Sequence, residues 1–347
     1  METVPAFISG KIETAVGVLP RVASVWSSLD RWDTLKVRWS IGRMKYRVEP
    51  GIYAVGNPDR SSRVFVTGNY KLSFDHLRRA LSGVDGWILV IDTKGVNVWC
   101  AAGKGTFGTK ELVKRIRHHH LGLLVDHRKI ILPQLGATGV AAHDVKKMTG
   151  FAVIYGPVRA NDLTDFLKAG LKATDAMRRV TFPLTERLKL IPVDLFYGKY
   201  YMLVVPAVFF LLAGLNPGGY SVDLAINSGW KAIINLYVGY LSGCVLTPVL
   251  LPWIPFRRFS VKGLVVGWLA ALLLLFIGTL GPSVSEKISW FLMMGGLSSF
   301  MAMNFTGSST FTSLSGVEKE MKTALPGQIV VTTIGLAGWI LTRFFSL

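Results

Sequence analysis

Asn97-Val98-Trp99-Cys100-Ala101-Ala102-Gly103-Lys104 is the stretch on which the interpretation of the chain depends. It follows an apolar run at residues 87–92, which is typical of a buried strand. After a turn at residues 105–108, residues 109–116 are predicted to form a helix with Thr109 as its N-cap. The cysteine therefore lies beyond the carboxyl end of a strand, where open α/β sheets place their ligands.

The surroundings of Cys100 favour a reactive or metal-ligating thiol. Ala101, Ala102 and Gly103 are small enough for a bulky partner to approach the sulfur. If the stretch is a helical turn, its amide dipoles and Lys104 favour the thiolate over the thiol. A buried structural cysteine is an equally good interpretation of these residues alone.

The part of the chain around this stretch alternates between strands and helices. Strands are predicted at residues 63–70, 87–92, 128–132 and 151–155, each ending in a turn that contains glycine, and a strand pair is predicted around Pro50-Gly51. Four alternations of this kind predict a Rossmann-like, mostly parallel α/β domain over residues 46–175. Several such turns on one edge make a concave site lined by backbone amides.

The flanking segments are less regular. Residues 1–45 are predicted to be a separate N-terminal segment, amphipathic or irregular, with one or two helices over residues 8–32 broken near Pro20. Residues 176–199 are predicted to be a basic linker between the α/β domain and the apolar C-terminal part of the chain.

The last part of the chain carries long apolar runs, which predict an all-helical transmembrane domain of about five helices over residues 200–347. The predicted spans are residues 200–215, 230–251, 262–280, 288–303 and 328–345, of which the first and fourth are short. Lys and Arg gather before the first predicted span and in the loop after the second. The positive-inside rule then places the α/β domain in the cytoplasm, as part of a multi-pass protein of the cytoplasmic (inner) membrane.

Charge and cysteine content restrict the class of protein. The formal net charge of the 347-residue chain is +18, which fits nucleic-acid binding or a membrane protein with a basic cytoplasmic face. The long apolar runs favour the second, so no nucleic-acid partner is expected. The two cysteines, Cys100 and Cys244, are far apart, which excludes a disulfide framework and a cysteine-ligated iron–sulfur centre.

Common cofactor motifs are absent. None of the six histidines fits the Asp-x-His-x-x-Gly pattern of one class of cobamide proteins. Gly103-Lys104-Gly105-Thr106 lacks the full phosphate-loop pattern. His118-His119-His120 is expected to be a basic helix end rather than a metal site, because three consecutive side chains do not share a helix face.

Residues 97–104 carry a resemblance to a known family. Together with residues 66–70, 92–95, 103–109, 132–136 and 155–159, they resemble the HgcA family, the corrinoid proteins of bacterial and archaeal mercury methylation. The resemblance covers most of the chain beyond residue 45. The soluble part is also similar to the corrinoid domain of the corrinoid iron–sulfur protein of the acetyl-CoA pathway.

The resemblance implies a role for each part. Cys100 would be the catalytic residue and the lower axial ligand of cobalt in a bound cobamide, carried on a cap helix over the corrin ring. Residues at strand ends would surround the corrin and its nucleotide tail. The implied cofactor-binding residues are Thr67, Asn69, Asp92, Thr93, Asn97, Val98, Trp99, Cys100, Ala101, Ala102, Gly103, Lys104, Gly136, Thr138, Gly156 and Val158.

The resemblance also implies the reaction, which is transfer of a cobalt-bound methyl group to inorganic Hg(II) in an anaerobic cell. A small ferredoxin-like 4Fe-4S protein, HgcB, would be the electron donor, and the protein that donates the methyl group is not identified. Two alternatives stay open, namely a corrinoid methyl carrier with another acceptor and a transporter with a ligand-binding cytoplasmic domain.

Overall fold

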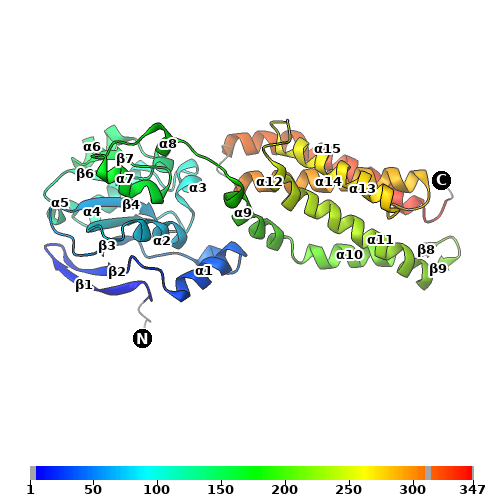
Figure 1. Ribbon diagram of the computed structural model, residues 1–347, viewed down its shortest axis with the longest axis horizontal. Coiled ribbons are helices and arrows are strands. Elements are labelled where there is room, and N and C mark those ends of the chain that lie inside the picture. The colour runs from blue at the N-terminus through cyan, green and yellow to red at the C-terminus, as the bar shows by residue number, and fades with distance from the viewer. Residues whose placement is uncertain (1–4, 309–313, 346–347) are drawn as a thin grey trace. The chain divides into compact units, whose positions relative to one another are not determined.

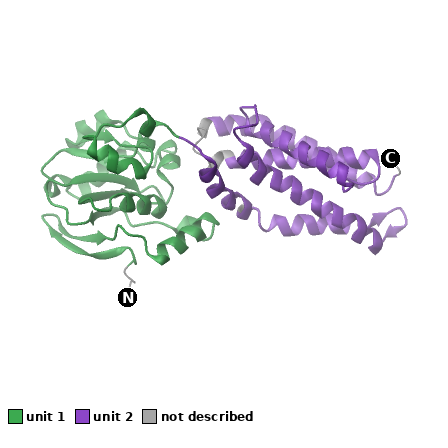
Figure 2. Ribbon diagram, in the orientation of Figure 1, with its two compact units in different colours: residues 1–180 green, residues 181–347 purple. Residues whose placement is uncertain are grey.

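The computed structural model describes residues 5–308 and 314–345. The chain divides into two compact units, Met1–Val180 and Thr181–Leu347, called unit 1 and unit 2 below (Figure 2).

Unit 1 is an α/β domain in which strands and helices alternate (Figure 1). Its strands are β1 (Ile8–Thr14), β2 (Gly17–Val22), β3 (Gly51–Val55), β4 (Arg63–Gly68), β5 (Gly86–Ile91), β6 (Lys129–Leu132) and β7 (Ala152–Tyr155). Its helices are α1 (Ser28–Arg38), α2 (Lys71–Ala80), α3 (Val98–Gly103), α4 (Thr109–His118), α5 (Leu121–Leu124), α6 (Ala142–Thr149), α7 (Leu163–Lys168) and α8 (Asp175–Arg178), with short 3₁₀ turns η1 (Arg43–Lys45), η2 (Gln134–Gly136) and η3 (Ala160–Asp162).

The strands of unit 1 form one sheet in the order β1-β2-β3-β5-β4-β6-β7. Pairing is parallel between β2 and β3, β4 and β5, β4 and β6, and β6 and β7, and antiparallel in the other two pairs. The predicted α/β class with mostly parallel strands is therefore confirmed. The register Thr67↔Val90 and Gly68↔Ile91 aligns the carboxyl ends of β4 and β5.

Apolar side chains on both faces of the sheet hold unit 1 together. All six residues of β5 are buried, as expected for a central strand covered on both sides. Alternate residues point to opposite faces, so Leu89 joins a core with α3 and α4, while Ile88 joins a second core with α2 and α7.

The prediction for the N-terminal segment is wrong over residues 8–22, although one helix, α1, begins at Ser28 as part of it. Residues 8–22 form the hairpin β1–β2 instead of a helix, and β2 pairs with β3, so the segment belongs to the α/β unit. The burial of β1 alternates residue by residue, which is the period of a strand. The hairpin turns at Gly17, whose φ of +110° suits glycine.

A second correction concerns the region of Pro50-Gly51. The predicted strand pair is a single strand, β3, which lies antiparallel to β5 and starts at Gly51. Arg47, on the other side of the proline, instead makes an isolated bridge to Tyr70. Proline lacks the amide hydrogen that a continuous ladder needs.

Unit 2 is almost entirely helical (Figure 1). Its elements are α9 (Leu184–Tyr197), α10 (Tyr201–Leu212), the short pair β8 (Leu215–Asn216) and β9 (Gly219–Tyr220), α11 (Val222–Leu241), a π-helical turn (Ser242–Leu246), α12 (Thr247–Leu250), α13 (Phe259–Ile277), α14 (Val284–Ser308) and α15 (Leu314–Leu341). The segment predicted as a basic linker is thus largely helical, because α9 occupies most of it.

The described residues contain four helices that are long and apolar enough to cross a membrane, or five if the bent pair α9–α10 is one span. The prediction of about five membrane helices agrees with this range. The fourth predicted span is longer than expected, because Val284–Phe305 passes as a full span. The first predicted span, residues 200–215, holds only one helix, α10, which counts as a span only together with α9, bent from it by 57°.

Two buried cations satisfy carbonyl groups at the C-terminal end of α12 and in the turn after it. Nη1 of Arg187 donates to the carbonyls of Pro248 and Val249 at 2.8 and 2.7 Å. Nζ of Lys262 donates to the carbonyls of Leu251 and Ile254 at 2.6 and 2.7 Å. Carbonyl groups at a helix end have no partner within the helix, so these side chains replace the water that would otherwise satisfy them.

Candidate functional site

The candidate site lies at one edge of the sheet in unit 1, where the parallel strands β4, β5, β6 and β7 end. Four segments come after these ends, at residues 69–70, 92–97, 133–141 and 156–159. Helices from adjacent strands leave toward opposite faces, because α2 packs in one core and α3 and α4 pack in the other. Open α/β sheets bind ligands at such a change of direction.

Helix α3 carries the cysteine at this edge. Oδ1 of Asn97 caps the helix by accepting a hydrogen bond from the backbone N of Cys100 at 2.9 Å. Ala101 and Ala102 are buried against the core, whereas the thiol of Cys100 is partly exposed. The predicted helical turn is confirmed, and its outward face presents Trp99, Cys100, Gly103 and Lys104.

Asn69, just after β4, anchors the loop that leads into α3. Its Oδ1 accepts hydrogen bonds from the backbone N of Thr93 at 3.0 Å, from Oγ1 of Thr93 at 2.9 Å and from the backbone N of Gly95 at 2.9 Å. Its Nδ2 donates to Oδ1 of Asp92 at 3.1 Å. Hydrogen bonds therefore link three predicted site residues, Asn69, Asp92 and Thr93. The fourth, Asn97, lies at the end of the loop that these bonds hold.

The other end of α3 is held by the loop after β6. Phe107 is fully buried, and a Cβ added at Gly136 would lie 2.5 Å from its ring. A Cβ at Gly139 would collide with the backbone of Phe107 and Ala102. Glycine at both positions thus allows the loop to approach α3 closely.

Helix α4 begins beside this loop, with a different cap from the predicted one. Gly108 is the N-cap, and Thr109 is the first helical residue. Oγ1 of Thr109 accepts a hydrogen bond from the backbone N of Ala141 at 2.9 Å, and its own backbone N donates to the carbonyl of Gly139. The hydroxyl therefore joins α4 to the β6 loop.

The remaining predicted positions lie around the same edge. Gly156 is buried over Phe166 and Ile131, and the backbone N of Val158 donates to the carbonyl of Met177 at 2.8 Å. Thr138 is exposed and Val158 is partly exposed. In contrast, five of the predicted residues are buried and can support the loops at this edge but offer little surface to a ligand. They are Thr67, Asn69, Thr93, Val98 and Gly136.

Two residues that sequence reasoning did not single out also position the site. Oε1 of Glu111 accepts a hydrogen bond from the backbone N of Asp92 at 3.1 Å, and Arg115 Nε donates to the same oxygen at 2.6 Å. Phe107 fills the space between α3 and the β6 loop. An acidic residue in the first turn of a helix is the only signal that pointed to Glu111.

The described residues hold no group of three or more His, Cys, Asp and Glu side chains that could bind a metal ion. His118 ends α4 and His119 is its C-cap, as predicted for a basic helix end. Burial, with the adjacent His118, Arg115 and His120, lowers the pKa of His119 and favours its neutral form.

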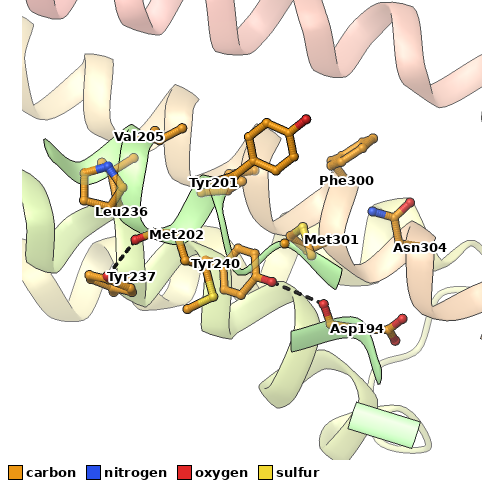
Figure 3. Close-up of a pocket in the computed structure, with 13 residues that line it drawn as sticks. Asp194, Tyr201, Met202, Val205, Leu236, Tyr237, Tyr240, Phe300, Met301 and Asn304 are labelled. Carbon is orange, nitrogen blue, oxygen red and sulfur yellow. Dashed lines mark hydrogen bonds between the residues drawn. The ribbon is translucent and has the colours of Figure 1, made fainter. Parts of the chain in front are cut away.

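Unit 2 contains a cavity of its own, about 540 Å³ in volume, between α9, α10, α11 and α14 (Figure 3). The hydroxyl of Tyr240 donates to the carbonyls of Asp194 and Leu195 at 3.3 and 3.2 Å, and the hydroxyl of Tyr237 donates to the carbonyl of Met202 at 2.7 Å. These hydroxyls satisfy backbone carbonyls next to the bend between α9 and α10. Cys244 is fully buried in a neighbouring apolar cluster.

Comparisons with known proteins concern unit 1. Residues 13–167 match the sequence model of the family described as the CO dehydrogenase/acetyl-CoA synthase delta subunit. The acetyl-CoA decarbonylase/synthase complex subunit gamma of Methanopyrus kandleri is 34% identical over 132 residues, which are 37% of this chain and 28% of that protein. The same subunit of Methanocaldococcus jannaschii is 30% identical over 154 residues, 42% of this chain and 31% of that protein.

The corrinoid/iron–sulfur protein large subunit of Moorella thermoacetica is 28% identical over 127 residues, 36% of this chain and 28% of that protein. The chain thus spans only about three-tenths of the length of these relatives. Unit 1 is a distant homologue of these proteins. The matched residues begin within β1, in agreement with the placement of the N-terminal hairpin in the sheet, and they end before unit 2.

Proposed function

We propose that the chain is a membrane-anchored corrinoid methyltransferase that transfers a methyl group to inorganic Hg(II) and gives methylmercury. The observation that carries the proposal is the partly exposed Cys100 on a capped helical turn, at the ligand-binding edge of a domain homologous to a corrinoid protein. The membrane helices of unit 2 supply the anchor.

The residues at this edge fit a large planar cofactor. Cys100 would be the ligand to cobalt, since it is the one cysteine in the sequence of unit 1 and its side chain is partly exposed. Its neighbours Ala101 and Ala102 are small and buried, and Trp99, Lys104 and Thr138, which are exposed or partly exposed, would be available for contacts with the ring and its tail. Asn69 and Thr93 would act by holding the loop before α3, because their polar atoms are already used there.

A sulfur ligand to cobalt is the reason for proposing Hg(II) as the acceptor. A bound corrinoid would supply the cobalt-bound methyl group. Cys100 would hold the cobalt through its sulfur, and an electron-rich sulfur ligand would favour transfer of the methyl group as a carbanion or a radical. Hg(II) is an electrophile and accepts a carbanion-like methyl group, whereas the usual acceptors of corrinoid proteins are nucleophiles that take a methyl cation.

The chain needs a partner to restore the reduced cofactor. With two cysteines in the whole sequence, it has too few thiols for a four-cysteine iron–sulfur cluster. A ferredoxin-like 4Fe-4S protein of the HgcB type is the partner that the resemblance implies. The basic residues before the first span would keep unit 1 on the cytoplasmic side, where such a donor is found.

The names of the relatives favour a second candidate, a corrinoid methyl carrier that serves another acceptor. Two of them are named as subunits of acetyl-CoA decarbonylase/synthase complexes, and these names do not mention mercury. The two candidates share the cofactor and Cys100 and differ only in the acceptor. An assay of methylmercury separates them.

The test combines a spectrum with an assay. The chain is purified anaerobically with its corrinoid, and its visible spectrum is compared with that of Cys100→Ala. We expect a corrin spectrum that shifts when the sulfur is lost, and methylmercury formation that falls to background. Cys244→Ala is the matched control, because that thiol is buried in unit 2 and its loss is expected to leave both readouts unchanged.

Full methylmercury formation by Cys100→Ala would refute the proposed role of the sulfur. A corrin spectrum without methylmercury formation would favour the methyl carrier. The absence of corrin from both samples would refute both candidates and leave a ligand-binding transporter as the better interpretation.

A further inference from the structure

Helix α1 presents an apolar stripe to the outside of unit 1. Leu29, Trp32, Leu35 and Trp39 are spaced three, three and four residues apart, so they share one face of the helix. They are exposed by 49, 56, 45 and 39%, and the stripe continues in Ile41 and Met44, exposed by 50 and 74%. We call these six residues the α1 stripe.

The opposite face of α1 is the buried one, and two of its three buried residues are polar. Asp30, Thr34 and Val37 are turned toward the domain and are 4, 8 and 2% exposed. An amphipathic helix on a globular domain normally buries its apolar stripe. The orientation of α1 is therefore inverted, which requires a specific attachment to the domain.

Ion pairs between α1 and α2 provide that attachment. Oδ1 of Asp30 lies 3.1 Å from Nζ of Lys71 and 2.8 Å from Nη2 of Arg78. Asp75 pairs with both cations at 2.7 Å. The capping box between Ser27 and Asp30 starts the helix at this point. Four buried charges thus fix α1 with its apolar stripe facing outward.

The charges around the α1 stripe are mainly basic. Residues 25–47 hold six Lys and Arg residues against two Asp residues. Of the two acids, Asp30 is buried in the ion-pair cluster, and Asp33 pairs with Lys36 at 3.3 Å. Arg31, Lys45 and Arg47 are exposed beside the stripe.

We infer that the α1 stripe inserts into the surface of a lipid bilayer that contains anionic lipids. A helix with Trp and Leu on one side and Lys and Arg around them is the type that lies in the interface between headgroups and acyl chains. Tryptophan favours this depth, where its apolar ring is buried and its N–H stays hydrated. Contiguous exposed apolar surface of this kind is rare on a domain surrounded only by water.

The membrane helices of unit 2 favour a lipid bilayer, rather than a separate protein, as the surface that covers the α1 stripe. They keep unit 1 tethered to a bilayer, so the effective concentration of lipid at α1 is high and a weak affinity suffices. The stripe follows α1 and continues into the turn η1, so it forms one elongated apolar strip. The inference does not depend on the corrinoid or on the proposed reaction.

The test reconstitutes the full chain in vesicles of three parts phosphatidylcholine to one part phosphatidylglycerol, with a photoreactive diazirine in the acyl chains. Trypsin releases residues 32–36, which hold Trp32 and Leu35 of the stripe. Residues 118–128 are the internal control, because Leu123 there is 56% exposed without belonging to the stripe. We expect lipid labelling of residues 32–36 to exceed that of the control by about tenfold.

Two changes should reduce this labelling. Trp32→Glu with Leu35→Glu is expected to lower the labelling of the α1 region at least fivefold, whereas Leu123→Glu leaves it unchanged. Vesicles of phosphatidylcholine alone should also give weaker labelling, because the basic residues lose their anionic partners.

Equal labelling of residues 32–36 and 118–128 in the unaltered chain would overturn the inference, and this comparison does not require any variant to fold. Cross-links from Lys36 or Lys45 to unit 2, or to a second copy, in place of lipid labelling would also overturn it and would identify what covers the stripe.

Discussion

Replacing Asn69 by leucine tests whether the loop before α3 depends on one side chain. Leucine has a similar size and cannot accept hydrogen bonds, so the buried backbone N–H groups of Thr93 and Gly95 lose their acceptor. Oγ1 of Thr93 keeps its second partner, the carbonyl of Val96 at 2.7 Å. Each buried unsatisfied amide costs about 1–3 kcal/mol, which gives about 2–6 kcal/mol for the pair.

The assay for Asn69→Leu is hydrogen–deuterium exchange of the full chain, read at the amides of α3. The backbone amides of Ala101 and Lys104 donate within the helix, to the carbonyls of Asn97 and Cys100, so we expect both to exchange slowly while α3 is formed. A loss of about 2 kcal/mol corresponds to roughly 30-fold faster exchange at these amides, since each 1.4 kcal/mol is a factor of ten. Corrinoid affinity should fall in parallel.

The control for this experiment is Asn161→Leu, an exposed asparagine in η3, which is expected to leave exchange in α3 unchanged. If exchange at Ala101 and Lys104 is the same in Asn69→Leu as in the unaltered chain, the loop is held by other contacts and the reasoning is wrong.

Three further predictions concern the stability of unit 1. Gly136→Val is expected to lower the free energy of unfolding by about 1–3 kcal/mol through overpacking against Phe107, whereas Gly10→Ala, with open space around it, should have little effect in thermal unfolding. Asp30→Ala removes one partner from each of two buried cations, Lys71 and Arg78, and should lower the free energy of unfolding in denaturant by about 3–5 kcal/mol. Asp33→Ala, in the more exposed pair with Lys36, should lower it by less than about 1 kcal/mol. Burial opposes ionisation of Asp30, but hydrogen bonds from Ser27, Arg78 and Lys71 outweigh it and lower its pKa far below 3.8. The stability from this carboxylate is therefore present above pH 3.8 and is lost only as pH falls further. The free energy of unfolding should thus show no loss due to Asp30 between pH 7 and 5. A loss with a midpoint near pH 5 that Asp30→Asn removes would contradict this.

Local sequence patterns predicted the elements that depend on local chemistry. The apolar run of β5 is confirmed, because a continuous buried strand has a short-range signature, and the helical turn that was expected from the sequence only as a condition is present as α3. The N-terminal hairpin was missed because the apolar residues of β1 and β2 also fit a loose helical period. The alternation in β1 became decisive only with β2 paired to it and β2 in turn paired to β3.

The parts that sequence reasoning could not reach depend on contacts between distant residues. The hydrogen bonds from Thr93 and Gly95 to Asn69 join positions 24 and 26 residues apart, and no local pattern distinguishes this asparagine from one that touches a ligand. The outward stripe of α1 was hidden for a related reason. Pattern analysis assumes that an apolar helix face points inward, and the ion pairs with α2 that reverse α1 are set by tertiary structure.

Helix α3 has six residues, too few to be stable by itself, so the position of Cys100 is a property of the sheet edge rather than of the helix. Asn69 holds the loop on one side of α3, and Phe107 with the glycines of the β6 loop holds the other. Both supports are buried, while the sulfur is partly exposed. A ligand that binds the sulfur therefore meets a preformed surface, and substitutions at Asn69 or Gly136 should weaken binding by displacing α3, although neither side chain needs to touch the ligand.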